Sequence, residues 1–310
     1  MSCIKEIRRV LAAYRGLKAE GTPAALATVI GVAGSSYRRI GARLLVAADG
    51  RCEGGISGGC LEGDALRRAQ RAIFTGTPSV QVYDTLEGED RVIGIGLGCN
   101  GRIEVLFQPL DYTADNPLEQ LGRLDFSVDN TLVLPLDDRD DLVEYIPAPP
   151  HLYIVGHNYD LPPLLDQCAL LEWDVTLVGP AKKYDREIVA RFGTPIPDEV
   201  LPTRTLTPRD AVIFMTHDYN RDLALLAGVL ALAPHYLGVL GPRKRMAKLA
   251  DELGRPELTE ADFLYAPIGL DIGALDPYEI ALAIVAEVLS VRRRREGTYL
   301  RRRGGAIHAT

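Results

Sequence analysis

Gly54-Gly55-Ile56-Ser57-Gly58-Gly59-Cys60-Leu61-Glu62 is a glycine-dense loop that runs straight into a helical pattern. Glycines at this density let the backbone pass close to a ligand or adopt a positive φ. A helix N-terminus offers unpaired N–H groups and partial positive charge, which favours anions and lowers the pKa of a thiol. Cys60 stands at this junction. The stretch therefore indicates an anion- or metal-binding loop, with a tight turn around a buried cysteine as the alternative.

The residues before this loop predict an amphipathic helix at 3–19 and strands at 24–32 and 42–48. Between the two strands, the segment 31–41 contains glycines, two serines and two arginines. Backbone donors, hydroxyl groups and guanidinium groups are what an anion-binding loop needs, although many loops are rich in glycine and serine for other reasons.

A second glycine loop follows the first. The pattern predicts a helix at 61–75 and strands at 79–84 and 103–108, and the loop at 93–101 contains Cys99. A chain that twice places a cysteine in a glycine-dense loop suggests paired use of the two thiols. Chance placement of two core cysteines is the alternative.

Composition excludes several classes of protein. A length of 310 residues predicts two domains, and a net charge of −7 disfavours general nucleic-acid binding. The sequence has neither a long apolar run nor an apolar signal core, so we expect a cytoplasmic protein without membrane spans. Five scattered cysteines argue against a disulfide framework. The arginines at 292–295 and 301–303 form either a solvated tail or a site for an anionic partner.

The second half alternates strands and helices. Residues 125–150 are acidic and then proline-rich, which predicts a linker between a domain at 1–124 and a domain at 151–310. Strands are predicted at 151–156, 174–178, 211–216 and 236–240, separated by helices. This order is typical of a Rossmann-like, doubly wound parallel sheet, so the fold class is α/β with a mixed α+β first domain.

The dinucleotide fingerprint of such a sheet is incomplete. The first turn, at 156–160, keeps only one glycine, and Gly179 and Pro180 stand where a ribose-binding carboxylate is expected. A nicotinamide dehydrogenase is therefore disfavoured. His217 and Asp218 follow a later strand, and Arg243 opens a basic helix. These residues suit a ligand site, or else a hydrogen-bonded turn and a solvated first turn.

Taken together, these motifs resemble the XdhC/CoxI family of xanthine dehydrogenase accessory factors. Tyr37 replaces the family's usual proline, Asn100 replaces a glycine, and the first turn of the second domain departs from the usual Gly-Ala-Gly-His-Asp. The matching segments are Gly34-Ser35-Ser36 with Arg38, Gly41-Ala42-Arg43, Ala48-Asp49-Gly50, 55–62, 96–101, 216–226, 240–245, 266–293 and 297–308.

The resemblance implies a chaperone that binds the molybdenum cofactor (molybdopterin), assists its sulfuration and helps insert it into a xanthine dehydrogenase-type or CO dehydrogenase-type molybdoenzyme. It also implies a cysteine desulfurase as a partner, and often a homodimer. The alternative is a Rossmann-type enzyme that binds a nucleotide or NAD(P). No nucleophile–base pair declares itself, so a non-catalytic role is favoured. Cys60 is also the candidate metal ligand, and the candidate cofactor-binding residues are Cys60, Cys99, Ser35, Ser36, Arg38, Arg43, Ser57, Gly58, Gly59, Glu62, His217, Asp218 and Arg243.

Overall fold

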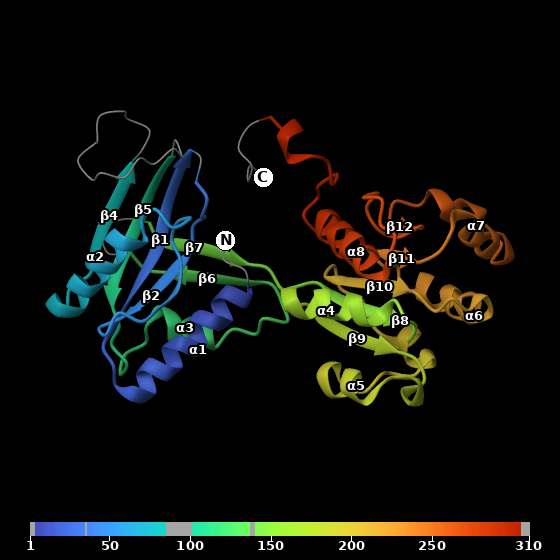
Figure 1. Cartoon of the computed structure of the whole chain (residues 1–310), viewed down its shortest axis with the longest axis horizontal. Helices are drawn as coiled ribbons and strands as arrows, with labels where there is room; N and C mark the ends of the chain where they lie inside the picture. Colours follow the sequence, from blue (N-terminus) through green and yellow to red (C-terminus); the bar gives the residue numbers. More distant parts are fainter. Residues whose placement is uncertain (1–3, 35, 85–100, 137–139, 305–310) are drawn as a thin grey trace. The chain divides into compact units, whose positions relative to one another are not determined.

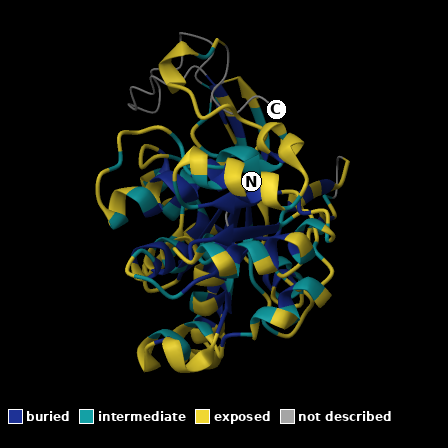
Figure 2. Cartoon of the chain, turned by 90° about the vertical axis from the view of Figure 1, so that its right-hand side faces the viewer, coloured by how far each residue is buried: buried dark blue, intermediate teal, exposed yellow. Residues whose placement is uncertain are grey.

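The computed structural model describes residues 4–34, 36–84, 101–136 and 140–304. The chain forms two compact units, one made of Met1–Ala148 with Arg303–Thr310 and the other of Pro149–Arg302 (Figure 1). In both units the strands are mostly buried, and exposed residues lie on the outer helix surfaces and loops (Figure 2).

The first unit is built on a five-stranded antiparallel sheet with strand order β3-β2-β1-β5-β4. Its central strand, β1, alternates small and apolar residues that are buried on both faces, because helices cover the sheet from both sides. The elements, in chain order, are α1 (Ile4–Glu20), β1 (Ala24–Gly34), β2 (Arg43–Ala47), β3 (Cys52–Gly54), α2 (Glu62–Thr75), β4 (Ser79–Asp84), β5 (Gly101–Pro109), α3 (Pro117–Gly122), β6 (Asn130–Leu134) and β7 (Leu142–Ile146).

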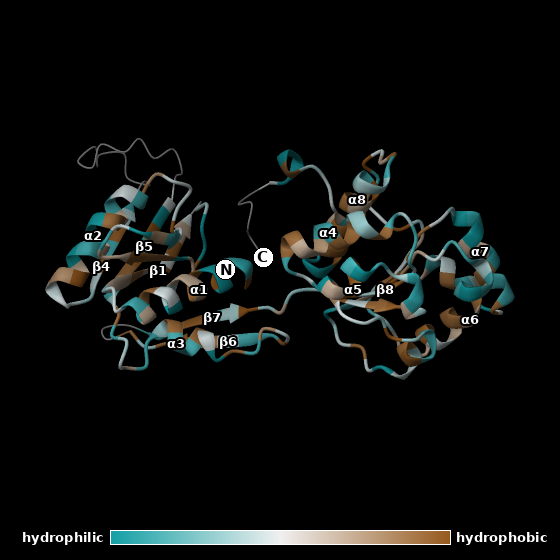
Figure 3. Ribbon diagram, turned by 60° about the horizontal axis from the view of Figure 1, so that its bottom comes forward, coloured by the Kyte–Doolittle hydropathy of each residue, from teal (hydrophilic) through white to brown (hydrophobic). Residues whose placement is uncertain are grey.

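Two apolar cores lie on opposite faces of this sheet. Helix α2 packs Ala65 and Ala69 against one face, and α1 packs Ile7 and Leu11 against the other together with α3 and the β6–β7 pair. The odd residues of β1 near Ala25 join the α2 core, and the even residues join the α1 core. Figure 3 shows the apolar character of β1 as brown ribbon.

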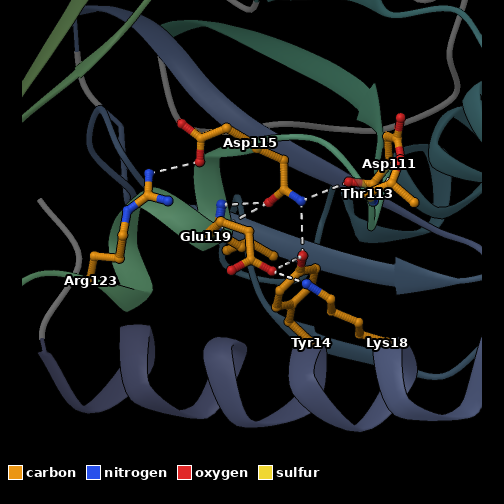
Figure 4. A network of polar contacts seen from close by, with 9 residues as sticks. Tyr14, Lys18, Asp111, Thr113, Asp115, Glu119 and Arg123 are labelled. Atoms are coloured by element: carbon orange, nitrogen blue, oxygen red, sulfur yellow. Dashed lines mark hydrogen bonds and ion pairs between the residues drawn. The ribbon is translucent and has the colours of Figure 1, made fainter.

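A polar network fastens α3 to α1 (Figure 4). The Tyr14 hydroxyl donates to Glu119 at 2.8 Å, and the Asn116 side chain donates to the Tyr14 oxygen at 2.8 Å. Asn116 also caps α3 by accepting from two of its backbone N–H groups. Burial raises the pKa of Tyr14 to about 12, so its hydroxyl stays a donor at neutral pH. The network holds the start of α3 at a fixed position on α1.

The segment 125–150 is not the linker that its composition predicts. Strands β6 and β7 pair within it, and Leu132, Leu134, Leu142 and Ile146 are buried in the α1 core. The alternating pattern of β7 buries every second side chain against the rest of the unit. The chain therefore passes from the first unit to the second at residues 148 and 149.

The second unit contains a five-stranded parallel sheet with strand order β12-β11-β10-β8-β9. Helices α4, α5 and α8 pack on one face, and α6 and α7 on the other. The Rossmann-like prediction is confirmed. The elements are β8 (His151–Val155), α4 (Leu161–Leu171), β9 (Asp174–Val178), α5 (Arg186–Phe192), β10 (Asp210–Phe214), α6 (Tyr219–Leu230), β11 (Leu237–Val239), α7 (Arg243–Glu252), β12 (Leu264–Tyr265) and α8 (Pro277–Arg292).

The order of the strands reverses between β8 and β10, because the chain first moves outward to β9 and then crosses to the other side of β8. In open parallel sheets, ligands bind beyond the carboxyl ends of the strands at such a switch point. A ligand site in this unit would therefore be built from the turns that follow β8 and β10.

Candidate functional site

Glycines stand at strand ends along one edge of the sheet of the first unit. Gly34, at the end of β1, pairs with Gly101, and Asp84 pairs with Arg102. On the other side of β1, Gly54 pairs with Leu44 near the start of β2. The described loops 36–42 and 55–61 therefore both follow or precede strand ends at this edge. Cys99 itself, like Ser35, lies outside the described residues.

The loop at 54–62 has an internal frame made by Ser57 and Glu62. The Ser57 backbone N–H donates to Glu62 Oε1 at 2.9 Å, and the Ser57 hydroxyl donates to Glu62 Oε2. The Gly59 N–H and the Leu61 N–H donate to Ser57 Oγ at 3.2 and 3.1 Å. Ile56 is completely buried and anchors the loop to the α2 core. Ser57 and Glu62 thus stabilise the loop and satisfy donors at the start of α2.

Cys60 is exposed on this frame. Its sulfur lies 3.6 Å from Ser57 Oγ. The alternative of a buried cysteine is therefore wrong for Cys60. Burial does apply to Cys168, where it raises the pKa of the thiol to about 12 and leaves it unreactive at neutral pH. A second exposed thiol, Cys52 on β3, was not singled out by the sequence because no glycine loop surrounds it.

Tyr37 brings the loop at 35–42 against the loop at 54–62. A Cβ placed on Gly58 would lie 3.5 Å from two carbons of the Tyr37 ring, so the ring rests on this glycine. The Tyr37 residue is nevertheless 71% exposed. Ser36 uses its hydroxyl within its own loop, donating to the Arg38 carbonyl at 2.8 Å. The site thus combines an exposed thiol, a glycine backbone and an aromatic ring.

The two arginines that we expected to bind an anion have carboxylate partners in the protein. Arg38 donates to both carboxylate oxygens of Glu6, at 2.8 and 2.9 Å. Arg43 is bound to Glu144 at 2.5 Å and donates to the Gly41 carbonyl at 2.6 Å. The Arg43 and Glu144 side chains are each only 2% exposed. Arg43 is therefore a structural residue, which corrects its assignment as an anion ligand.

The buried ion pair explains the Gly41-Ala42-Arg43 motif. Gly41 has a φ of +86°, and a Cβ there would lie 2.1 Å from Glu144 Oε1. Gly54 has a φ of +95°, and its Cβ would lie 2.2 Å from the Arg43 carbonyl oxygen. Both positions require glycine because protein atoms fill the space. The sequence signal for Glu144 was its place in the buried phase of the alternating segment 142–146.

In the second unit, His217 and Asp160 lie side by side at the switch point. His217 Nε2 is 2.8 Å from Asp160 Oδ2. His217 has a φ of +55°, which is uncommon for a residue with a side chain. Asp218, the neighbouring candidate, caps α6 by accepting from the Arg221 N–H at 3.1 Å. Arg243 is exposed in the first turn of α7.

The neighbouring part of this edge is filled by protein. The Tyr184 hydroxyl lies 2.8 Å from the Gly156 carbonyl oxygen and 2.7 Å from that of Val178. Arg221 donates to the Val178 carbonyl at 3.1 Å, and a Cβ on Gly179 would lie 2.7 Å from its guanidinium. These side chains occupy the end of β9, where a dinucleotide would place its ribose.

Helix α4 is also a poor phosphate site. Pro162 and Pro163 lack N–H groups, and the Leu161 N–H already donates to the Asn158 carbonyl at 3.0 Å. Its first turn therefore presents few donors to a pyrophosphate. The geometry agrees with the incomplete glycine fingerprint in disfavouring a nicotinamide dehydrogenase.

Comparison with known proteins matches both halves of the chain. A model of the XdhC Rossmann domain matches residues 152–288, and a model of the XdhC and CoxI family matches residues 17–84. A protein of Escherichia coli (strain K12), named molybdenum cofactor insertion chaperone PaoD, is 32% identical over 299 residues that cover 89% of this chain and 86% of that protein. The chain belongs to the XdhC and CoxI family.

Two further proteins of comparable length are similar along most of the chain. A Bacillus subtilis (strain 168) protein, named as a probable subunit of xanthine dehydrogenase, is 27% identical; the match covers 87% of this chain and 94% of that protein. A crystal structure of a xanthine dehydrogenase from Bacillus halodurans aligns with a TM-score of 0.77 at 27% identity, covering 93% of this chain and 97% of the other. The XdhC/CoxI resemblance is confirmed.

The described residues show neither a membrane-spanning helix nor a cluster of metal ligands. No helix there is both long enough and apolar enough to cross a membrane. Nor do three or more His, Cys, Asp and Glu side chains gather there in a way that could hold a metal ion.

Proposed function

We propose that this chain is a chaperone that binds the molybdenum cofactor as cargo and delivers it to a xanthine dehydrogenase-type molybdoenzyme. The observation that carries the proposal is the exposed Cys60 thiol, held on a glycine loop that internal hydrogen bonds of Ser57 and Glu62 support. The names of two relatives, a molybdenum cofactor insertion chaperone and a probable xanthine dehydrogenase subunit, support it.

The chemistry of the cargo fits these residues. Molybdopterin carries a phosphate and a flat heteroaromatic ring system whose dithiolene holds the metal. Thiolates are soft ligands that suit a metal of this kind or a transferred sulfur. The Gly59 backbone has a φ of +111° and nothing lies within 4 Å of the Cβ position, so a ligand can approach it closely. Cys60 would contact the molybdenum or its sulfur, and the Tyr37 ring would pack against the pterin.

The remaining candidate residues either position Cys60 or are further candidate ligands. Ser57 and Glu62 position Cys60 through their hydrogen bonds within the loop. Gly58 has no side chain, which allows the Tyr37 ring to pack against it. Cys99, Ser35 and Ser36 remain candidate ligands from the adjoining segments. In the second unit, His217 and Arg243 are candidate contacts for an anionic group, and Asp218 fixes the turn that carries His217.

The proposal also includes the cellular setting of the protein. The chaperone would hold the cofactor while a cysteine desulfurase supplies the terminal sulfur, and it would pass the product to the molybdoenzyme. We place these steps in the cytoplasm and assign them to a homodimer.

Cofactor retention tests the proposal directly. The purified protein is mixed anaerobically with molybdenum cofactor and passed through a gel-filtration column, and molybdenum and pterin are then measured in the protein fraction. Wild type should retain about one cofactor per chain. Cys60→Ala should lose most of it, whereas Cys52→Ala, which removes the other described exposed thiol, should retain it.

Each outcome of this experiment decides a different point. If wild type retains neither molybdenum nor pterin, the carrier function is wrong. If Cys60→Ala retains the cofactor as well as wild type, the thiol assignment is wrong. Far-UV circular dichroism of both variants establishes that a lost cofactor does not reflect a lost fold.

A further inference from the structure

Helix α8 is largely apolar, and most of its circumference packs against its own unit while one side stays exposed. Ala281, Ile284, Val285 and Val288 face the core that it shares with α4. A helix that is apolar all round is ordinarily buried all round. The outer side of α8 therefore has the character of an interface.

The outer side forms a continuous apolar stripe. Tyr278 is 64% exposed, Leu282 50% and Leu289 39%. Ala286 lies between the two leucines. Their spacing of four, four and three residues places all four on one face of the helix. Leu275, which directly precedes the helix cap, is 91% exposed. Soluble proteins seldom leave a contiguous apolar row of this kind uncovered.

The two ends of the stripe carry opposite charge. Asp276 and Glu279 lie at its N-terminal end, and the four arginines 292–295 lie at its C-terminal end. Successive residues of an α-helix are about 100° apart, so Glu279 and Arg293 both fall beside the stripe. The surface is therefore acidic at one end, apolar in the middle and basic at the other end.

We infer that a second copy of this chain covers the stripe, with the two α8 helices antiparallel about a two-fold axis near Ala286. An axis at this point places Leu282 of one copy against Leu289 of the other. It also places the Glu279 end against the Arg293 end, twice. A surface that is acidic at one end and basic at the other is complementary to itself only in this antiparallel arrangement.

Ala286 suits the centre of such an interface. Two helices that cross at a small residue approach each other closely, and the larger leucines on both sides then interdigitate. Tyr278 reaches the arginine end of the other copy, where an aromatic ring can contact a guanidinium group. The interface is thus specified by an aromatic residue, two leucines, a small residue and an arginine along one helix.

This inference names the contact surface of the proposed homodimer, and it rests on that part of the proposed function alone. Oligomeric state and cofactor retention are separate measurements. A monomer that still retains the cofactor would overturn the interface and leave the chaperone role in place.

The first test is the mass of the full-length protein in solution, measured by light scattering coupled to gel filtration over a range of concentrations. Wild type should be a dimer. Leu282→Glu should raise the dimer dissociation constant by at least about 30-fold, because it buries two unpaired charges in the apolar middle of the interface. Phe74→Glu is the matched control, since Phe74 is 91% exposed on α2 and lies outside the stripe.

A monomeric wild type at all concentrations overturns the inference, as does a Leu282→Glu variant that remains dimeric. The first result includes the case in which another part of the same chain covers the stripe. A dimer that Phe74→Glu also dissociates would assign the contact to a different surface and would equally overturn it.

Charge reversal tests the antiparallel pairing without disturbing the apolar middle. Glu279→Arg and Arg293→Glu should each weaken the homodimer, because each places like charges at both ends. An equimolar mixture of the two variants should recover the dimer, since every arginine then meets a glutamate. Glu279→Gln controls for the contact that Glu279 makes with the Leu275 N–H at 2.7 Å. Failure of the mixture to dimerise, when wild type does, would rule out the antiparallel arrangement.

Discussion

The two units use glycine in opposite ways at the edges of their sheets. In the second unit, Gly156 and Gly179 follow β8 and β9, and protein atoms fill the space where a side chain would stand. In the first unit, Gly59 faces open space beside the Cys60 thiol. A filled glycine makes room for protein, whereas an open glycine such as Gly59 leaves room for a ligand to approach the backbone. This difference favours the loop that carries Cys60 as the proposed cargo site.

Gly41 and Gly54 refine the comparison, because they lie in the first unit and still make room for protein. The carboxylate of Glu144 and the carbonyl of Arg43 occupy their side-chain positions. The first unit thus contains both kinds of glycine within one loop region. The filled glycines hold the loop in place, and the open one faces the proposed cargo.

The largest effect should come from breaking the support of this loop region. Glu144→Gln leaves the Arg43 guanidinium buried without a charge partner, so the free energy of unfolding should fall by about 3–5 kcal/mol. Urea denaturation followed by circular dichroism measures the change. Arg191→Met is the control, because the Arg191–Asp166 pair is exposed and its loss should cost at most about 1 kcal/mol. Equal losses in the two variants would show that the buried pair is not special.

A smaller effect should separate the two kinds of glycine. Gly156→Ala forces a Cβ to within 2.7 Å of the Met215 carbonyl oxygen and requires a φ of +141°, so it should destabilise the protein by about 2–4 kcal/mol. Gly59→Ala meets no atom and should cost about 1–2 kcal/mol for its positive φ alone.

Gly156→Ala should cause the larger loss of stability, but Gly59→Ala should cause the larger loss of cofactor retention. Gly59→Ala should reduce retention, since its methyl group enters the space beside Cys60, while Gly156→Ala should retain the cofactor at temperatures where it is folded. Thermal unfolding and molybdenum content, measured on the same samples, give both rankings. If Gly156→Ala loses the cofactor and Gly59→Ala does not, the assignment of the two edges is reversed.

The last prediction requires no substitution and compares the reactivity of one thiol in each unit. Cys60 should react with a maleimide in the native protein within minutes at about pH 7, because it is exposed. Cys168 should remain unlabelled up to about pH 9, since burial raises the pKa of its thiol to about 12 and keeps it protonated. Peptide mass spectrometry after labelling identifies the modified residues, and labelling in denaturant shows that both can react. Native labelling of Cys168 would contradict its burial.

Much of the fold could be predicted from local sequence patterns. The strand predicted at 79–84 matches β4, and the helix predicted at 61–75 matches α2 within one residue. Both have strong periodicity and clear glycine or proline boundaries. Between β9 and β10, where the sequence predicts a helix, a short 3₁₀ turn first ends at Lys183 and α5 starts only at Arg186.

What the sequence could not provide depends on contacts between distant residues. Arg43 and Glu144 are separated by 101 positions, so nothing local distinguished this buried arginine from an anion ligand. The segment 125–150 resembled a linker because of its acidic and proline-rich stretches. Its four buried apolar side chains become a core only when α1 and α3 cover them. Tyr184, which fills the end of β9, carried no signal at all in the sequence.

The buried pair of Arg43 and Glu144 also has a mechanical consequence. Glu144 lies on β7, which ends at Ile146, two residues before Ala148, where the chain leaves the first unit. Arg43 begins β2, and its carbonyl accepts from the Gly55 N–H at 2.7 Å. A pulling force applied at the junction near residue 149 would therefore travel along β7 to the ion pair and from there to the backbone of the thiol-bearing loop. The junction between the two units is therefore linked through one buried ion pair to the loop that carries Cys60.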